Sequence, residues 1–254
     1  MKRRDILKLG SGTIIALPAC SGGKKEKVVK KSDKGAPRQP SYRHLPSKFS
    51  TMEVTHRCGP KDQPYVAMTF DDGPHPQNTP RLLDILRARN IKATFYVIGN
   101  LVDRHPEIVR RIVAEGHEIG NHTYTHRKLT TLNDYAVDEE MRKTEQSIIR
   151  ATGVKPRTMR PPYGALTQRQ RGMIFSRFSY PTIMWSIDPE DWKRPGPSVV
   201  ASRILTNAHN GAIILAHDLH APTIDAMPQT FDGLLSRGYQ FITVSQMLAR
   251  KGRA

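Results

Sequence analysis

Two adjacent carboxylates are the first residues in this sequence whose types and spacing could do chemistry. Asp71 and Asp72 follow an apolar run, and Gly73 and Pro74 force the chain to turn directly after them. Neighbouring carboxylates repel each other and are costly to remove from water, so they need a compensating cation or proton. One aspartate could therefore bind a metal ion while the other faces the substrate.

His122 and His126 could complete the metal site. Their spacing would put both imidazoles on one face of a helical turn, where one ion could bridge them. In a chain with 10 histidines, such a pair could also arise by accident on the surface. Two histidines and one carboxylate leave coordination positions open, which is typical of a catalytic site. We expect a divalent ion, zinc first, although cobalt, nickel or iron also suit these ligands.

Hydrolysis of an amide would further need a base, an oxyanion contact and an acid. The aspartate that does not bind the metal would be the base, with Arg160 to hold it. Two prolines stiffen the turn before Tyr163, whose backbone N–H could point into the site. His217 would be the acid, oriented by Asp188. The alternatives are a structural salt bridge for Arg160 and a packed core histidine for His217.

The elements that must position these residues follow from the alternation of short β-rich runs with helical patterns, which is typical of βαβ units. Helices are expected from Thr79-Pro80, from Pro106 to Gly116, and over residues 133–152 and 223–237. Each polar cluster lies at or just beyond the end of an expected strand, the rim on which α/β barrels build active sites. The expected strands span residues 65–70, 93–98, 118–120, 158–160, 182–187, 212–216 and 240–243.

Five motifs, taken together and in order, resemble those of the polysaccharide deacetylase family, which is carbohydrate esterase family 4 with the NodB homology domain. The match extends from about Tyr65 to Leu248, and no motif position departs from the family pattern. The fold that the resemblance implies is α/β, a distorted, TIM-like (β/α) barrel of about seven strands in a single catalytic domain. The motifs lie at residues 69–74, 122–126, 160–164, 188–192 and 215–217.

The resemblance also implies a role for each site residue. Asp71 would be the catalytic base, and the metal ligands would be Asp72, His122 and His126. Arg160 would contact the base, the Tyr163 backbone would contact the oxyanion, and Asp188 would pair with the acid His217. The pocket for the acetyl methyl group would be lined by Trp192 and Leu215.

The first residues predict export. Lys2-Arg3-Arg4 precede a mostly apolar run that is too short to span a membrane, and Leu17-Pro18-Ala19-Cys20 resembles a lipoprotein-processing box. Residues 1–19 are therefore expected to be a twin-arginine or lipoprotein signal, and Cys20 to carry lipid after cleavage. An ordinary secretory signal or a retained buried helix would be the alternatives.

Residues 20–60 are expected to form a basic, flexible tether, and residues 61–254 the catalytic domain. The formal charge of +17 suggests an anionic surface or acidic polymer as partner, and export argues against nucleic acid. With Cys20 lipidated, Cys58 is the only thiol left, so no intramolecular disulfide can form. An unlipidated form could instead contain a Cys20–Cys58 bridge.

We therefore expect a metal-dependent hydrolase that removes N-acetyl groups from an amino-sugar polymer. The first candidate is peptidoglycan N-acetylglucosamine, followed by chitin-like and exopolysaccharide oligomers. An acetylxylan-type O-deacetylase and a non-catalytic carbohydrate-binding envelope lipoprotein are the alternatives. The protein is expected to be a monomer, anchored to the bacterial cell envelope through Cys20 or secreted.

Overall fold

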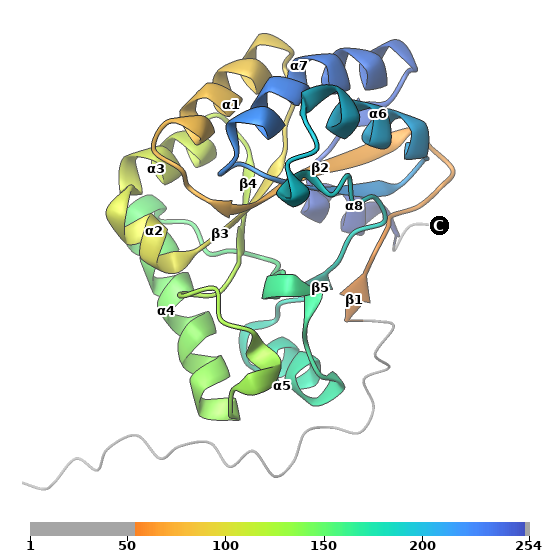
Figure 1. The fold of residues 1–254 in the computed structure, drawn as a ribbon. Helices are drawn as coiled ribbons and strands as arrows, with labels where there is room; N and C mark the ends of the chain where they lie inside the picture. Colours follow the sequence, from red (N-terminus) through yellow and green to blue (C-terminus); the bar gives the residue numbers. More distant parts are fainter. Residues whose placement is uncertain (1–53, 252–254) are drawn as a thin grey trace, which may run out of the picture. The chain divides into compact units, whose positions relative to one another are not determined.

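The computed structural model describes residues 54–251. The expected export signal, the lipidated Cys20 and most of the expected tether lie outside these residues. Within them, helices pack around strands in an α/β fold, which confirms the expected fold class (Figure 1). None of the described helices has the length and the apolar character that a membrane span needs.

The strands pair in parallel. In the larger sheet the order is β4, β3, β2, β6, with β7 beside the first residues of β2, and β1 pairs with β5 in a second, two-stranded sheet. The strands among the described residues are β1 (Thr55–His56), β2 (Tyr65–Gly73), β3 (Thr94–Val97), β4 (Glu118–Asn121), β5 (Thr182–Ile183), β6 (Ala212–His217) and β7 (Gln240–Phe241).

Single-residue bridges connect the two sheets into a distorted barrel. Met159 bridges Asn121 of β4 on one side and Thr182 of β5 on the other. Further along the chain, Ile187 bridges Ile214 of β6, which returns to the central strand β2. Strand pairing is thus continuous through β4, β3, β2 and β6, and it is reduced to single-residue bridges between β4 and β5 and between Ile187 and β6.

This irregular part is shorter than predicted, because the strands expected at residues 158–160 and 182–187 are reduced to Met159 and the two residues of β5. Prolines account for the short first segment and for the start of β5. Pro156 and Pro161 flank the first segment and Pro181 precedes β5, and a proline has no N–H with which to extend a strand ladder.

The core lies on both faces of β2, the longest strand, whose residues 66–71 are all buried. Val66, Met68 and Phe70 pack outward in the large cluster between strands and helices, whereas Ala67 belongs to a smaller cluster with Tyr96. Side chains alternate between the two faces of a strand, so a strand buried on both faces appears in the sequence as an unbroken apolar run. This burial fixes the position of the aspartates at the end of β2.

Local sequence sets the ends of several helices as expected. Pro106 begins α3, Asn133 caps α4 through its side-chain oxygen, and Gly153 ends α4 with φ 72°. The α-helices among the described residues are α1 (Asn78–Ala88), α2 (Gly99–Arg104), α3 (Pro106–Ala114), α4 (Asp134–Thr152), α5 (Gln168–Phe178), α6 (Pro197–Asn207), α7 (Ala221–Ser236) and α8 (Val244–Lys251).

The folded domain begins earlier than the predicted boundary at residue 61. Val54 is buried, and the β1 residues pair with β5. The backbone of Cys58 forms an antiparallel β-bridge with that of Ala212 in β6. A two-residue strand has too little pattern to be recognised in a sequence, although its backbone hydrogen bonds join it to the barrel. Residues 54–60 therefore belong to the domain and not to the tether, and Cys58 is a free thiol.

Candidate active site

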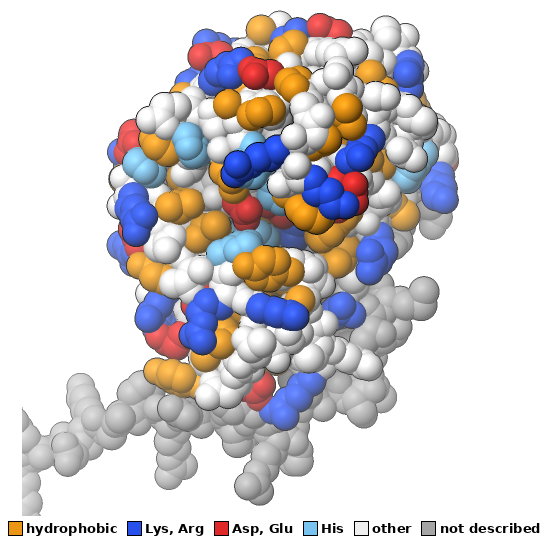
Figure 2. All heavy atoms as spheres, viewed as in Figure 1, with side chains coloured by type: hydrophobic (Ala, Val, Ile, Leu, Met, Phe, Trp, Pro, Cys, Tyr) orange, Lys and Arg blue, Asp and Glu red, His pale blue; other side chains and the backbone are white. Residues whose placement is uncertain are grey.

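A cavity of about 500 Å³ lies at the carboxyl ends of β2, β4 and β6. Figure 2 shows acidic and histidine side chains inside a hollow that hydrophobic and basic side chains surround. Of the ten residues that the sequence predicted for the site, nine line this cavity, and Arg160 is buried behind it. The structure therefore brings the predicted site together.

Asp72, His122 and His126 present three possible ligand atoms to one another. Oδ1 of Asp72 lies 3.2 Å from Nε2 of His122 and 3.0 Å from Nε2 of His126. Ligands that bind one zinc ion tetrahedrally at their usual bond lengths are about 3.3 Å apart. The spacing of these atoms therefore suits a single divalent ion.

The hydrogen bonds around His122 test whether these residues fit a metal ion. Nδ1 of His122 lies 2.7 Å from the carbonyl oxygen of Arg160, so Nδ1 carries the proton and donates it. In the neutral ring, Nε2 is then an acceptor, and it faces the acceptor oxygen Oδ1 of Asp72, which is buried without a hydrogen-bond partner. Acceptors that face one another in this way fit a cation between them.

The segment with both histidines is a loop and not the helical turn predicted from their spacing. β4 ends at Asn121, and Thr123 and His126 have left-handed backbone angles of φ 68° and φ 58°. The Asn121 side chain accepts the N–H of Thr123, and Glu140 of α4 accepts two further N–H groups of the loop. These bonds, and not helical geometry, hold the two imidazoles together.

Asp71 turns away from the metal ligands toward Arg160. Oδ1 of Asp71 accepts a hydrogen bond from Nη1 of Arg160 at 2.8 Å, and the guanidinium also donates to the carbonyls of Ile183 and Met184. Arg160 is fully buried. Asp72 has φ 73°, which separates the directions of the two adjacent carboxylates. Arg160 therefore fixes Asp71 in place, as predicted.

Tyr163 offers a backbone donor beside the metal ligands. It has φ 59°, and its ring packs edge-on against His126 with centroids 4.9 Å apart. The N–H groups of Gly164 and Ala165 bond to carbonyls of the same turn. Within residues 54–251, no protein acceptor bonds to the N–H of Tyr163, which leaves it available to a substrate oxygen.

His217 ends β6, and its partner is Asp191 and not the predicted Asp188. Nδ1 of His217 lies 2.8 Å from Oδ1 of Asp191, whose Oδ2 accepts the backbone N–H of His217 and the hydroxyl of Thr223. Asp188 is exposed and accepts a backbone N–H of its own loop. A short 3₁₀ helix, Asp191–Lys193, turns the later aspartate of the motif inward.

Asp191 decides the charge of His217. Burial by itself lowers the pKa of a histidine, but the hydrogen bond and charge of Asp191, with help from Asp71 and Asp72, raise the pKa of His217 to about 9. The imidazole is therefore a cation at neutral pH. Because Nδ1 is bonded to Asp191, Nε2 is the nitrogen left to donate a proton in the cavity.

This cavity agrees with what the chain is similar to. Residues 59–174 match the family model for polysaccharide deacetylase. Chitooligosaccharide deacetylase from Bradyrhizobium sp. is 37% identical over 72% of this chain and 90% of its own length. The crystal structure of the Bc1960 peptidoglycan N-acetylglucosamine deacetylase has a TM-score of 0.74 and 35% identity, and the match covers 76% of this chain and 92% of that chain. The chain belongs to the polysaccharide deacetylase family.

Longer relatives match as well. Peptidoglycan-N-acetylglucosamine deacetylase PgdA from Listeria monocytogenes is 38% identical over 209 residues, which are 82% of this chain. The match spans only 43% of that protein's length. The likeness to PgdA therefore concerns the deacetylase domain described here.

The pocket of this family member is completed by residues of β6 and of the segments that follow β5 and β6. Trp192 is half exposed and Leu215 is buried, and both line the cavity as the family resemblance implied. Two further lining residues, Trp185 and His220, were not among the predicted site residues. His220 follows His217 closely in sequence, which was the only signal for it, and Trp185 gave none.

A buried carboxyl group also supports the turn after β2. Asp218 is fully buried and accepts a hydrogen bond from the hydroxyl of Thr79, and burial raises the pKa of Asp218 to about 7. A Cβ atom on Gly73 would lie 2.3 Å from Oδ2 of Asp218. Only glycine therefore fits after Asp71 and Asp72, which explains this position of the first motif.

Proposed function

We propose that this protein is a metal-dependent deacetylase that hydrolyses N-acetyl groups of an amino-sugar polymer, with peptidoglycan N-acetylglucosamine as the first candidate substrate. The observation that carries the proposal is one cavity that contains a metal-ligand group, a carboxylate fixed by arginine and a cationic histidine. Each of the three supplies a different requirement of amide hydrolysis.

Asp72, His122 and His126 would hold the divalent ion, for which zinc is the first candidate and cobalt or nickel are alternatives. When bound, such an ion polarises the acetyl carbonyl and makes water more acidic. The two histidines and one carboxylate leave room for both groups. The Arg160 carbonyl keeps His122 in the tautomer that presents Nε2 to the ion.

Asp71 would act as the base and take a proton from the water that attacks the carbonyl carbon. Its bond to Arg160 keeps one oxygen occupied and leaves Oδ2 toward the cavity, 3.8 Å from Nε2 of His122. The N–H of Tyr163 would stabilise the negative oxygen that forms at the carbonyl. Neither group needs to move. The buried Arg160 holds the side chain of Asp71, and the left-handed backbone of Tyr163 sets the direction of its N–H.

His217 would donate a proton from Nε2 to the nitrogen as the C–N bond breaks, so that acetate and a free amine leave. An amine that leaves without a proton is a very poor leaving group. Asp191 keeps the acid protonated to a pKa of about 9 and orients it through two hydrogen bonds. Trp192 and Leu215 would surround the acetyl methyl group.

The experiment that tests this proposal measures acetate release by one preparation on peptidoglycan, chitooligosaccharides and acetylated xylan, with and without a chelator. We expect release from the N-acetylated polymers, its loss with chelator, and its return with added zinc. Release from acetylated xylan alone would replace the proposal by an O-deacetylase. Release from none of them would favour a binding protein.

The N-terminal sequence supports a place for this reaction. Residues 17–20 resemble a lipoprotein-processing box after a basic start and a short apolar run. We propose that the mature protein is a monomer held at the cell envelope by lipid on Cys20. In that position it would meet peptidoglycan first.

A further inference from the structure

We propose that a side cavity next to the metal ligands binds the sugar ring that neighbours the deacetylated one, with the Nε2–H of His75 as its hydrogen-bond donor. This inference rests on the proposed deacetylase function and adds a glycan-binding site to it. The side cavity has a volume of about 290 Å³, and Asp72 and His126 line both it and the active-site cavity. The two cavities therefore meet at the metal ligands.

The walls of the side cavity are mostly apolar. Among residues 54–251, the polar residues that line it, apart from the two metal ligands, are His75 and His105, and no lysine or arginine lines it. Apolar walls with a few fixed polar groups are typical of sites for small ligands, whose volumes begin at about 300 Å³. The remaining lining residues are Pro74, Pro76, Ile98, Leu101 and Leu219.

Hydrogen bonds join the segments that form these walls. The N–H of Ile98 donates to the carbonyl of Gly73 at 2.9 Å, which places the start of α2 beside the end of β2. The N–H of the next residue donates to the carbonyl of Thr123 at 2.9 Å and joins α2 to the loop of the histidine ligands. From α1, the side-chain amide of Asn78 donates to the carbonyl of Leu219 at 3.0 Å. The side cavity is therefore formed before any ligand binds.

The hydrogen bonds of His75 fix its ring and its tautomer. The N–H groups of Gln77 and Asn78, where α1 begins, donate to Nδ1 of His75 at 3.2 Å and 3.1 Å. Burial lowers the pKa of His75, so the ring is neutral at pH 7. A ring nitrogen that accepts hydrogen bonds carries no proton, so the proton is on Nε2. Within the described residues Nε2 has no hydrogen-bond partner, which leaves it free to donate to a ligand.

The backbone around His75 is also held in place. Its N–H donates to the hydroxyl of Thr79 at 2.7 Å, and that hydroxyl donates to the buried carboxyl group of Asp218. Pro74 and Pro76, on either side of His75, restrict the backbone further. A donor that is fixed in advance loses little conformational entropy when a ligand binds.

A sugar ring matches this chemistry. Its C–H faces are apolar, its hydroxyl and acetamido oxygens accept hydrogen bonds, and it is uncharged. A polymer whose acetyl group lies beside the metal ligands continues as a chain of such rings, and the side cavity begins at two of those ligands. Figure 2 shows hydrophobic and histidine side chains on the surface beside the hollow. An acidic peptide fits less well, because no lysine or arginine of the described residues lines the side cavity.

The test measures kcat/KM for acetate release on oligomers of N-acetylglucosamine of increasing length, and on peptidoglycan fragments of the same lengths with and without their peptides. His75→Asn is the main variant, because its amide oxygen can still accept the N–H groups at the start of α1 but the side chain ends short of Nε2. Leu101→Ala removes part of the apolar wall and leaves the start of α1 intact. His209→Asn is the control, since His209 precedes β6 at the opposite end of the strand. Metal content is measured for every variant.

In the parent enzyme, we expect one added sugar to raise kcat/KM, mainly by lowering KM, because its ring fills the side cavity. His75→Asn should reduce this gain roughly three- to tenfold, as loss of one hydrogen bond does. Leu101→Ala should reduce the gain from the same sugar, and His209→Asn should leave the whole series unchanged.

Equal losses at every length in His75→Asn, or no loss at any length, would overturn the sugar site. Loss of metal in this variant would also overturn it, because His75 would then support the metal ligands. A loss confined to fragments that carry peptides would assign the side cavity to a peptide. If the parent enzyme releases no acetate from any glycan, the deacetylase proposal itself has failed.

Discussion

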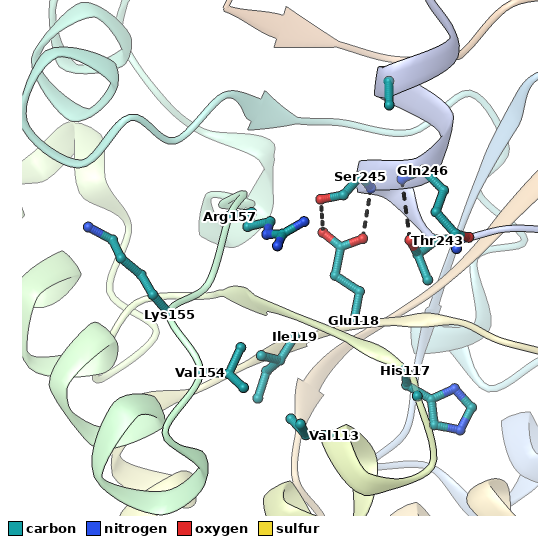
Figure 3. A pocket seen from close by; sticks show the side chains of 12 residues that line it. Val113, His117, Glu118, Ile119, Val154, Lys155, Arg157, Thr243, Ser245 and Gln246 are labelled. Carbon is teal, nitrogen blue, oxygen red and sulfur yellow. Dashed lines mark hydrogen bonds between the residues drawn. The ribbon is translucent and has the colours of Figure 1, made fainter.

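Two cavities at opposite ends of the strands differ in what their polar groups do. The cavity at the start of β4 has a volume of about 390 Å³, close to that of the candidate active site (Figure 3). There, both oxygens of Glu118 accept hydrogen bonds from the N–H and hydroxyl of Ser245 at the beginning of α8, and Gln246 and Thr243 cap each other. In the active-site cavity, Asp72, the N–H of Tyr163 and His220 have no such partner. The two cavities are close in size, so the three converging ligand atoms of Asp72, His122 and His126, and not volume, distinguish the candidate active site.

The two cavities also differ in the pKa of a buried histidine. His117 lines the cavity at the start of β4, and burial, with the charge of Lys92, lowers its pKa to about 4. Asp191 raises the pKa of the similarly buried His217 to about 9. Burial alone makes a histidine neutral, so a cationic one needs a carboxylate that the fold has placed beside it.

Backbone strain is also distributed unevenly. Of the eight non-glycine residues with positive φ within residues 54–251, three line the active-site cavity and three more lie within two residues of a lining residue. Such angles cost free energy and persist where the surrounding structure enforces them, which is common at functional sites. The six are Asp72, Thr123, His126, Tyr163, Glu190 and Arg194.

The largest effect predicted by this contrast is the loss of metal in His126→Ala. With one ligand removed, Asp72 and His122 should no longer retain the ion, and acetate release should fall to background. His209→Ala is the control, because His209 precedes β6 at the opposite end of the strand. Metal content, acetate release and circular dichroism are measured for both variants. Stoichiometric metal in the His126 variant would remove this histidine from the ligand set.

Asp71→Asn should have the next largest effect, a fall in kcat of roughly 10²- to 10⁴-fold with the metal retained. An asparagine still offers an oxygen to the buried Arg160, so the fold should survive. Asp72→Asn, measured in parallel, should lose metal instead. If the two variants show the reverse pattern, the base and the ligand have been exchanged.

Asp191→Asn should change the pH dependence of kcat. His217 must be protonated to act as acid, so activity of the parent enzyme should fall as the pH rises through about 9. Without the carboxylate, burial still lowers the pKa of His217 and only the charges of Asp71 and Asp72 oppose it, so the alkaline limb should move to lower pH. Asp188→Asn should leave the limb in place. A limb that moves in the Asp188 variant and stays in the Asp191 variant would restore the pairing expected from the sequence.

The sequence was sufficient for the parts of this site that depend on strand burial. The apolar run of β2 predicted where Asp71 and Asp72 lie, and residues at the ends of parallel strands necessarily meet at one rim. Arg160 and His217 were placed correctly for the same reason. The cavity was thus predictable from alternating strands and helices together with the five motifs.

The remaining details depend on loop conformations that the residue types do not reveal. Thr123 is β-branched, so its left-handed angle could not be expected, and the pair His122 and His126 was wrongly assigned to a helical turn. The 3₁₀ turn that directs Asp191 inward also separates two aspartates that look equivalent in the sequence. The loops are held by contacts with side chains of α4 and α7, which lie 15 or more residues further along the chain.

The smallest expected effect is that of Glu118→Gln, which should lower stability and leave acetate release within about twofold. The carboxylate bonds at the N-terminus of α8, where a negative charge contributes about 0.3–1 kcal/mol. For a domain of this size, that corresponds to a fall in Tm of roughly 1–4 °C. Asp62→Asn is the control, because Asp62 is exposed in the turn before β2 and lies at no helix N-terminus. Its Tm should change less. A large fall in kcat/KM of the Glu118 variant with unchanged Tm would mean that the second cavity also takes part in function, and the contrast between the two edges would no longer hold.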